Sequence, residues 1–128
     1  MIVLEKSSTA SYHLENQHGV SFYGVNSKRE KDGFTPFELI CSSVSLCMAL
    51  SIDALIERDD LDVQKYTIKV EPHKAEDRPS RIERFSVEVE IIGDVDEKAK
   101  QKLSKSAERA CTIGNTLKKG AEMEISLK

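Results

Sequence analysis

The sequence predicts an α+β fold for this chain of 128 residues. Apolar and polar residues alternate near the N-terminus and again in the middle of the chain, which is typical of half-buried strands. A long uncharged apolar run lies between these segments, and a narrow apolar stripe at helical spacing follows them. Because strands and helices do not alternate strictly along the chain, the pattern favours an α+β class over a parallel α/β sheet.

Composition indicates an ordinary globular protein with one domain over residues 1–128. Hydrophobic residues make up 39% of the chain and charged residues 32%, so a core can form without disulfide or metal. The formal net charge of −3 argues against broad binding of nucleic acid, which needs a basic surface. The apolar stretch Met1–Leu4 is too short for a secretory signal. We therefore expect a cytoplasmic protein.

The first third of the chain is predicted to form strands. Tyr12 and Leu14 alternate with polar neighbours, the segment Asn16–Gly19 has turn chemistry, and Phe22 resumes the alternation. This pattern predicts a β-hairpin, with residues 2–4 as a further strand.

A helix is predicted to begin after Thr35. Thr35, Pro36 and Glu38 occupy the N-cap, first and third positions of a capping box. From Leu39 to Ile56 apolar residues face nearly every direction of the helical wheel, which indicates a central helix covered on several sides. Its longest uncharged run, residues 39–52, has 14 residues and four serines, whereas a membrane span needs about 20 apolar residues. No membrane association is expected.

Two strands, a second helix and a closing strand complete the predicted order. The strands cover residues 66–70 and 85–91, with the charged segment Pro72–Arg81, including His73, as an exposed connection. Asp94 is the expected N-cap of the second helix, whose stripe is Ala99, Leu103, Ala107 and Ala110. Gly114 and Asn115 are expected to break the helical pattern. Met123, Ile125 and Leu127 then alternate as a C-terminal strand.

The three cysteines point to function. An odd number cannot form a closed disulfide framework, and thiols of an unexported protein stay reduced unless oxidation is their role. Cys47 lies about three turns into the apolar helix, Cys111 ends the second helix, and Cys41 reads as a core thiol. The three histidines are scattered and share no ligand spacing, so no metal site is expected.

Two cysteine contexts, 64 residues apart, resemble the OsmC/Ohr superfamily. The first is Pro36-Phe37-Glu38-Leu39 leading to Cys47, and the second is Cys111 followed by Asn115 and Leu117. The predicted element order is similar over essentially the whole chain. Phe37, Thr112 and Gly114 differ from the pattern of the peroxidase branch, so the chain looks more like the less characterised OsmC-like branch.

The resemblance implies an intertwined homodimer with the two long helices side by side, and thiol-dependent reduction of organic hydroperoxides in oxidative stress defence. Cys47 is then the attacking thiolate, Cys111 forms a disulfide with it, and an external dithiol resets the pair without a cofactor. In the peroxidase branch an arginine held by a glutamate supports the thiolate. The supporting candidates here are Arg29, Glu38 and Asn115.

Purely structural roles remain open for each supporting residue. Glu38 fits a capping box, Arg29 a charged surface loop and Asn115 a turn. A different function is also consistent with the residues: a non-catalytic dimeric module that binds a small hydrophobic ligand in an apolar interface cleft. Redox sensing by the Cys47/Cys111 pair is a third, weaker possibility.

Overall fold

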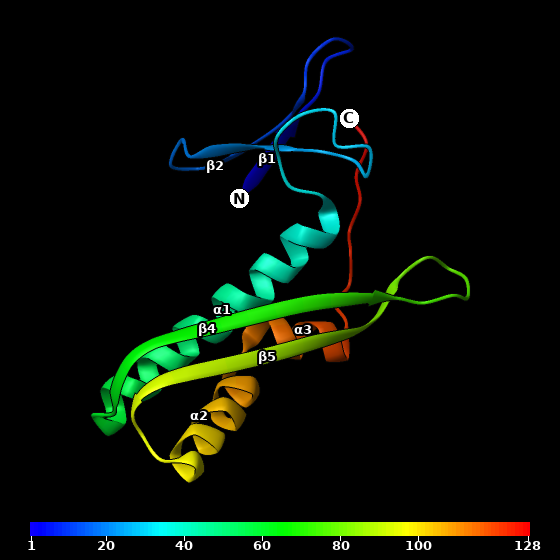
Figure 1. Ribbon diagram of the computed structural model, residues 1–128. Helices are drawn as coiled ribbons and strands as arrows, with labels where there is room; N and C mark the ends of the chain where they lie inside the picture. The colour runs from blue at the N-terminus through cyan, green and yellow to red at the C-terminus, as the bar shows by residue number, and fades with distance from the viewer. The chain divides into compact units, whose positions relative to one another are not determined.

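The computed structural model describes residues 1–128, which divide into two compact units, unit 1 (Met1–Ile40) and unit 2 (Cys41–Lys128). The elements, in chain order, are β1 (Ile2–Glu5), β2 (Tyr12–Asn16), β3 (Ser21–Gly24), α1 (Pro36–Asp59), β4 (Asp62–Lys74), β5 (Ile82–Asp94), α2 (Glu97–Ala110) and α3 (Thr112–Lys119) (Figure 1). This is an α+β architecture, as the sequence predicts.

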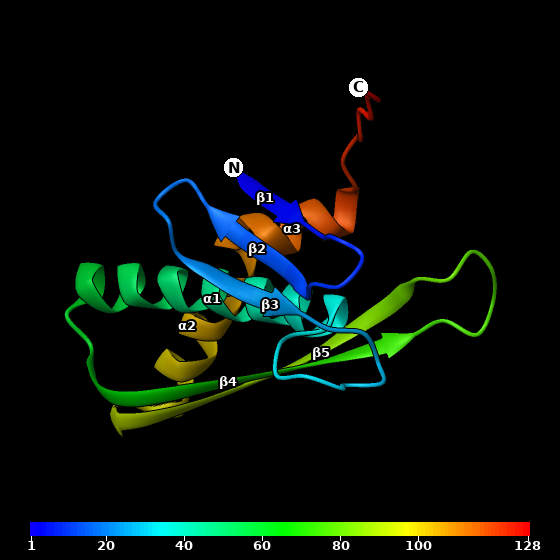
Figure 2. The same ribbon diagram turned by 90° about the horizontal axis from the view of Figure 1, so that it is seen from above.

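Unit 1 contains a three-stranded antiparallel sheet in the order β1-β2-β3 (Figure 2). The predicted hairpin turn is confirmed: the Asn16 side-chain oxygen accepts hydrogen bonds from the backbone N–H groups of His18 (2.9 Å) and Val20 (3.1 Å). Gly19 has a φ of +79°, a conformation that suits glycine because it has no Cβ. Local turn chemistry therefore fixes the register of β2 and β3.

The start of α1 is the predicted capping box. The Thr35 hydroxyl accepts a hydrogen bond from the Glu38 backbone N–H (3.2 Å), and the Glu38 carboxylate accepts one from the Thr35 N–H (3.2 Å). These reciprocal bonds satisfy backbone donors that have no partner within the helix. The capping interpretation of Glu38 is thus confirmed.

Unit 2 is built on the long antiparallel hairpin of β4 and β5. Tyr66 and Ile68 pair with Ile91 and Val89, so the predicted alternation places apolar side chains of both strands on one face. The strands extend further than predicted, because β4 continues through Pro72 to Lys74 and leaves a shorter connection at residues 75–81. The expectation of a solvated His73 is wrong: its ring is half-buried and its Nε2 lies 2.8 Å from the Ser86 hydroxyl.

Helices α1 and α2 cover the apolar face of this hairpin (Figure 1). The buried cluster comprises Ile52 of α1, Ile91 of β5, and Leu103 and Ala107 of α2. The Tyr66 hydroxyl donates to the Asp53 carboxylate at 2.7 Å, which satisfies both polar groups beside the cluster. By length and composition alone α1 could also cross a membrane, but core helices pass the same test, and Ile52 is fully buried here.

The chain after β5 differs from the sequence prediction at three points. Helix α2 begins at Glu97, because Asp96 rather than Asp94 is the N-cap and accepts a hydrogen bond from the Ala99 N–H (2.8 Å). Gly114 and Asn115 do not break the helical pattern but lie inside a short third helix, α3.

The predicted C-terminal strand is the third difference. Residues 120–128 form no strand, and the side chains of Met123, Ile125 and Leu127 are 87%, 92% and 99% exposed. Alternation of apolar residues makes a segment suitable for a strand, but a strand also needs a partner with free backbone groups. Within this chain the segment has none.

Candidate thiol redox site

Cys47 and Cys111 come together in unit 2. Helix α1 carries Cys47, the junction of α2 and α3 carries Cys111, and both cysteines belong to one packed cluster, in which the Cys111 thiol helps to lower the pKa of Cys47. Apolar side chains surround the pair: Val44, Met48, Ile68, Val70, Val89 and Ile113. The two cysteines singled out in the sequence are therefore neighbours in the core of unit 2.

Cys111 links the two C-terminal helices. Its backbone N–H donates to the Glu108 carbonyl at the end of α2 (3.3 Å), and its side-chain sulfur accepts from the Gly114 N–H as the N-cap of α3 (3.3 Å). The side chain is only 2% exposed. Cys111 is thus held in one position by bonds from both sides.

Backbone N–H groups at the start of α3 stabilise the Cys47 thiolate. They lower the pKa of Cys47 below its ordinary value of 9.0, the largest cause being the Ile113 N–H, with further contributions from the Cys111 thiol and the Thr112 N–H. Partial burial opposes this shift. The first amides of a helix carry a partial positive charge and have no partner within the helix, which suits them to an anion.

The pKa of Cys111 shifts in the opposite direction. Loss of hydration is the main cause that raises the pKa of Cys111, and the neighbouring Cys47 thiolate raises it further. The first proton therefore leaves Cys47, which is partly exposed, while Cys111 remains a buried thiol. The two thiols therefore ionise in a defined order, Cys47 first and Cys111 second.

Asn115 ties the start of α3 to the end of α2. Its side-chain N–H donates to the Arg109 carbonyl (3.0 Å), and its backbone N–H donates to the Cys111 carbonyl (2.9 Å). The Arg109 carbonyl is one of those that a helix leaves unpaired at its C-terminus. The bond therefore fixes the α2–α3 corner from which the amides of Thr112 and Ile113 reach Cys47.

Arg29 and Glu38 lie in unit 1 and form an ion pair and a hydrogen bond with each other. The Glu38 carboxylate also accepts from the Thr35 hydroxyl (2.8 Å). The hydrogen bonds from Thr35, followed by the Arg29 guanidinium, lower the pKa of Glu38. Arg29 thus has a glutamate partner, Glu38, two positions after Pro36. In the pattern of the peroxidase branch the glutamate stands one position earlier, where this chain has Phe37.

Sequence reasoning missed the donors of α3. Backbone amides have no side-chain signature, and Gly114-Asn115 resembles a helix end. A signal was nevertheless present, because Ile113 and Leu117 have the four-residue spacing of one helix face, and a cysteine, like serine, can serve as an N-cap acceptor. No group of three potential metal ligands occurs in the structure.

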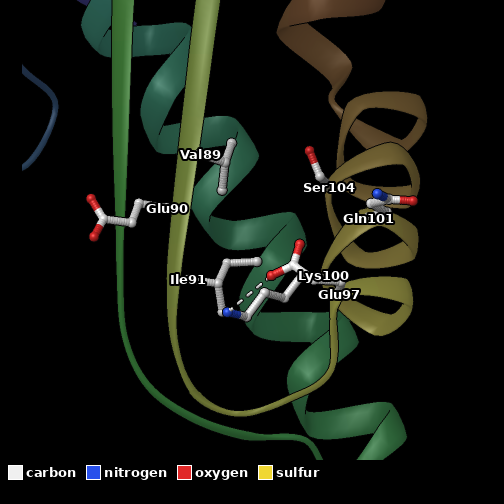
Figure 3. Close-up of a pocket in the computed structure, with 7 residues that line it drawn as sticks. All are labelled: Val89, Glu90, Ile91, Glu97, Lys100, Gln101 and Ser104. Carbon is white, nitrogen blue, oxygen red and sulfur yellow. Dashed lines mark ion pairs between the residues drawn. The ribbon is translucent and has the colours of Figure 1, made fainter.

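A cavity of about 360 Å³ lies apart from the thiols, between β5 and α2 (Figure 3). Val89 and Ile91 face it, Glu90 points away, and Lys100 forms an ion pair with Glu97 at its lower end (3.7 Å). The charged groups on its wall thus neutralise each other.

The model of the OsmC-like protein family matches residues 29–126, which include both cysteines. The chain belongs to the OsmC-like family. A search of the curated proteins finds no match.

Solved structures show the same fold at low sequence identity. An OsmC-like protein from Mycoplasma pneumoniae superposes with a TM-score of 0.82 at 14% identity, over 92% of this chain and 86% of that one. A hypothetical protein from Aquifex aeolicus gives 0.78 at 21%, over 94% and 87%. The organic hydroperoxide resistance protein OhrB of Bacillus subtilis gives 0.74 at 15%, over 94% and 90%. This OsmC-like protein therefore shares its fold with proteins named for resistance to organic hydroperoxides.

Proposed function

We propose that this OsmC-like protein is a thiol-dependent reductase of organic hydroperoxides that acts through Cys47 and Cys111 in oxidative stress defence. The observation that carries the proposal is that Cys47 and Cys111 lie together in one apolar cluster, with pKa values shifted in opposite directions. Fold similarity to hydroperoxide resistance proteins agrees with it. The apolar surroundings favour an alkyl or lipid-like hydroperoxide over hydrogen peroxide.

The proposed reaction has two steps within the chain. The Cys47 thiolate attacks the terminal peroxide oxygen, the O–O bond breaks, and the alkoxide takes a proton to leave as an alcohol, with Cys47 oxidised to a sulfenic acid. The Cys111 sulfur then attacks that sulfenic sulfur, water leaves, and a disulfide forms. An external dithiol returns the pair to thiols. We place this chemistry in the cytoplasm, where reductants are abundant.

Titration with cumene hydroperoxide tests the proposal. One equivalent should consume two of the three thiols per subunit, those of Cys47 and Cys111, and leave the Cys41 thiol unoxidised, because Cys47 and Cys111 lie in one cluster. Cys47→Ser should abolish peroxide consumption, whereas Cys111→Ser should leave a sulfenic acid that dimedone traps. Cys41→Ala is the control and should react like the unaltered protein. Unchanged thiol counts after exposure to peroxide would rule out the reductase.

A dimeric binding module for a small hydrophobic ligand is the second candidate, favoured by the purely apolar side chains around the thiols. Binding of a hydrophobic ligand by such a module does not require an ionised thiol. The lowered pKa of Cys47 therefore favours the reductase. A module of this kind would bind cumene without any reaction of its hydroperoxide.

We further propose that the working unit is a homodimer with the α1 helices in contact. Leu46 and Leu50 lie four residues apart on α1, so they share one side of the helix, and each is 62% exposed in the single chain. Exposed leucines at helical spacing are typical of a face covered by another helix.

A further inference from the structure

Charge is distributed unevenly along this chain. Although the whole protein has a net charge of −3, residues 97–119 contain seven basic and two acidic residues. These residues form α2 and α3, the two helices that meet at Cys111. The redox pair therefore lies beside the most basic part of an acidic protein.

Four of these basic residues form a stripe along α2. Lys98, Lys102, Lys105 and Arg109 are spaced by four, three and four residues, so they share one side of the helix, and all four are exposed. We name these four residues the basic stripe. It is about 16 Å long at the rise of an α-helix and ends two residues before Cys111.

Carboxylates near the basic stripe are already paired with other cations. Glu97 pairs with Lys100 (3.7 Å) and Glu108 with Lys118 (3.2 Å). Asp59, which feels the charge of Lys102, pairs with Arg58 (2.9 Å). The basic stripe has no ion-pair partner in the chain, and its neighbouring like charges repel each other at spacings that weaken a helix.

We propose that the basic stripe is the docking surface for an acidic protein that carries a dithiol and reduces the Cys47–Cys111 disulfide. The inference rests on the proposed function, which requires such a reductant. Charge complementarity favours an acidic surface, because unpaired cations beside a reaction centre accelerate the encounter with an anionic partner.

The partner reduces the Cys47–Cys111 disulfide by thiol–disulfide exchange. A partner thiolate attacks one sulfur of the Cys47–Cys111 disulfide, forms a mixed disulfide and releases the other cysteine. The second partner thiol then attacks the mixed disulfide and releases the remaining cysteine. The partner leaves as a disulfide, and two electrons and two protons have passed to this chain.

Two synthetic peptides serve as probes: a Cys-x-x-Cys dithiol flanked by glutamates, and the same peptide with glutamines. The full-length protein is first oxidised with diamide, so that disulfide formation does not depend on peroxide. At low salt the glutamate peptide should reduce it at least about tenfold faster than the glutamine peptide. Near 1 M salt, where charges are screened beyond about 3 Å, the difference should vanish.

A matched pair of variants locates the effect. Lys98→Gln with Lys102→Gln and Lys105→Gln should abolish the advantage of the glutamate peptide without changing the rate with dithiothreitol. Arg109 is kept, because its carbonyl accepts the Asn115 bond. Lys65→Gln with Lys69→Gln and Lys74→Gln removes the same charge from exposed positions of β4 and should keep the advantage.

Equal reduction by the two peptides, or equal losses in both triple variants, would overturn the proposal. Fluorescence anisotropy of the labelled glutamate peptide measures docking independently of electron transfer. If diamide forms no disulfide, the proposed function fails, while anisotropy still decides whether the basic stripe binds the peptide. Tighter binding of a single-stranded DNA oligonucleotide than of the glutamate peptide at physiological salt would assign the basic stripe to a different kind of partner.

Discussion

Cys47 and Cys111 carry the same side chain, yet their surroundings lower the pKa of Cys47 and raise the pKa of Cys111. Donated hydrogen bonds outweigh the modest burial of Cys47, whereas burial dominates at Cys111. A thiolate at Cys111 would face that of Cys47 in an apolar cluster, so double ionisation is disfavoured. This difference decides which of the two thiols ionises first, and it depends on backbone amides as much as on any side chain.

Replacing Thr112 by proline tests the role of these amides. Thr112 is the first residue of α3, a position that tolerates proline, so the helix should persist while one donor to Cys47 is lost. The pKa of Cys47 should rise. In a profile of iodoacetamide alkylation against pH, the midpoint for Cys47 should lie below 9.0 in the unaltered protein and move to higher pH in Thr112→Pro.

Thr112→Ser keeps the backbone donor and should leave the midpoint unchanged. Equal profiles for the proline and serine variants would show that the amides of α3 do not set the ionisation of Cys47.

Replacing Arg29 by methionine tests the proposed support from the Arg29–Glu38 pair. If the guanidinium stabilises the thiolate or the leaving alkoxide, the second-order rate with cumene hydroperoxide should fall roughly tenfold or more. Glu38→Gln keeps a capping oxygen for Thr35 but removes the charge that holds Arg29, and should give an intermediate rate. Lys31→Met removes another cation of the same loop as a control. A rate equal to that of the control would make Arg29 a surface residue.

At the scale of elements, the short helix α3 forms part of the candidate site. Its N-terminus supplies donors to both sulfurs, and Asn115 fixes its angle to α2. Elements with local signals could be predicted: the capping box of Thr35 and Glu38 and the turn at Asn16 use side chains within a few residues. Helix α3 has only weak local signals, because its two turns are stabilised by packing of Ile113 against a cluster that includes Val44 and Met48 of α1, which are distant in sequence.

The C-terminal segment shows the other limit of sequence reasoning. Met123, Ile125 and Leu127 have the alternation of a strand, but alternation specifies a face and not a hydrogen-bonding partner.

The Cys47 and Cys111 contexts were recognisable as a pair, whereas their contact depends on how α1 packs against β4, β5 and α3.

Asn115→Ala should loosen the corner between α2 and α3. Loss of one exposed side-chain hydrogen bond should lower the free energy of unfolding by about 1 kcal/mol, measured by urea denaturation. If Asn115 has a purely structural role, the variant should show this loss of stability and no other change. If Asn115 also positions the amides of α3, the alkylation midpoint of Cys47 should move to higher pH, because the donors no longer point at the thiolate.

Thr116→Ala is the matched control for Asn115. It removes a hydrogen bond of similar length within α3, from the Thr116 hydroxyl to the Thr112 carbonyl (2.8 Å), but leaves the bond to α2 intact. Similar loss of stability with an unchanged midpoint is expected. If Asn115→Ala and Thr116→Ala change the free energy of unfolding and the alkylation midpoint of Cys47 to the same extent, Asn115 has no positioning role.

At the scale of the whole molecule, the single chain leaves two kinds of surface without a partner inside the chain. One is the basic stripe of α2, and the other is the apolar side of α1 with Leu46 and Leu50. The first is suited to a transient charged partner, since exposed ion pairs form and dissociate readily. The second is suited to a permanent one, since burial of apolar area is the main source of stable association.

The double variant Leu46→Glu with Leu50→Glu tests the permanent partner. In a two-fold dimer each substitution acts twice, and each buried leucine contributes about 1.5–3 kcal/mol, so the dissociation constant should rise a thousandfold or more. Sedimentation velocity at micromolar concentration should show a dimer for the unaltered protein and a monomer for the variant, with circular dichroism confirming that the variant is folded. Val20→Glu changes a similarly exposed apolar residue in the turn between β2 and β3, and this variant should remain dimeric. A dimer that survives both changes on α1 would place the contact between subunits elsewhere.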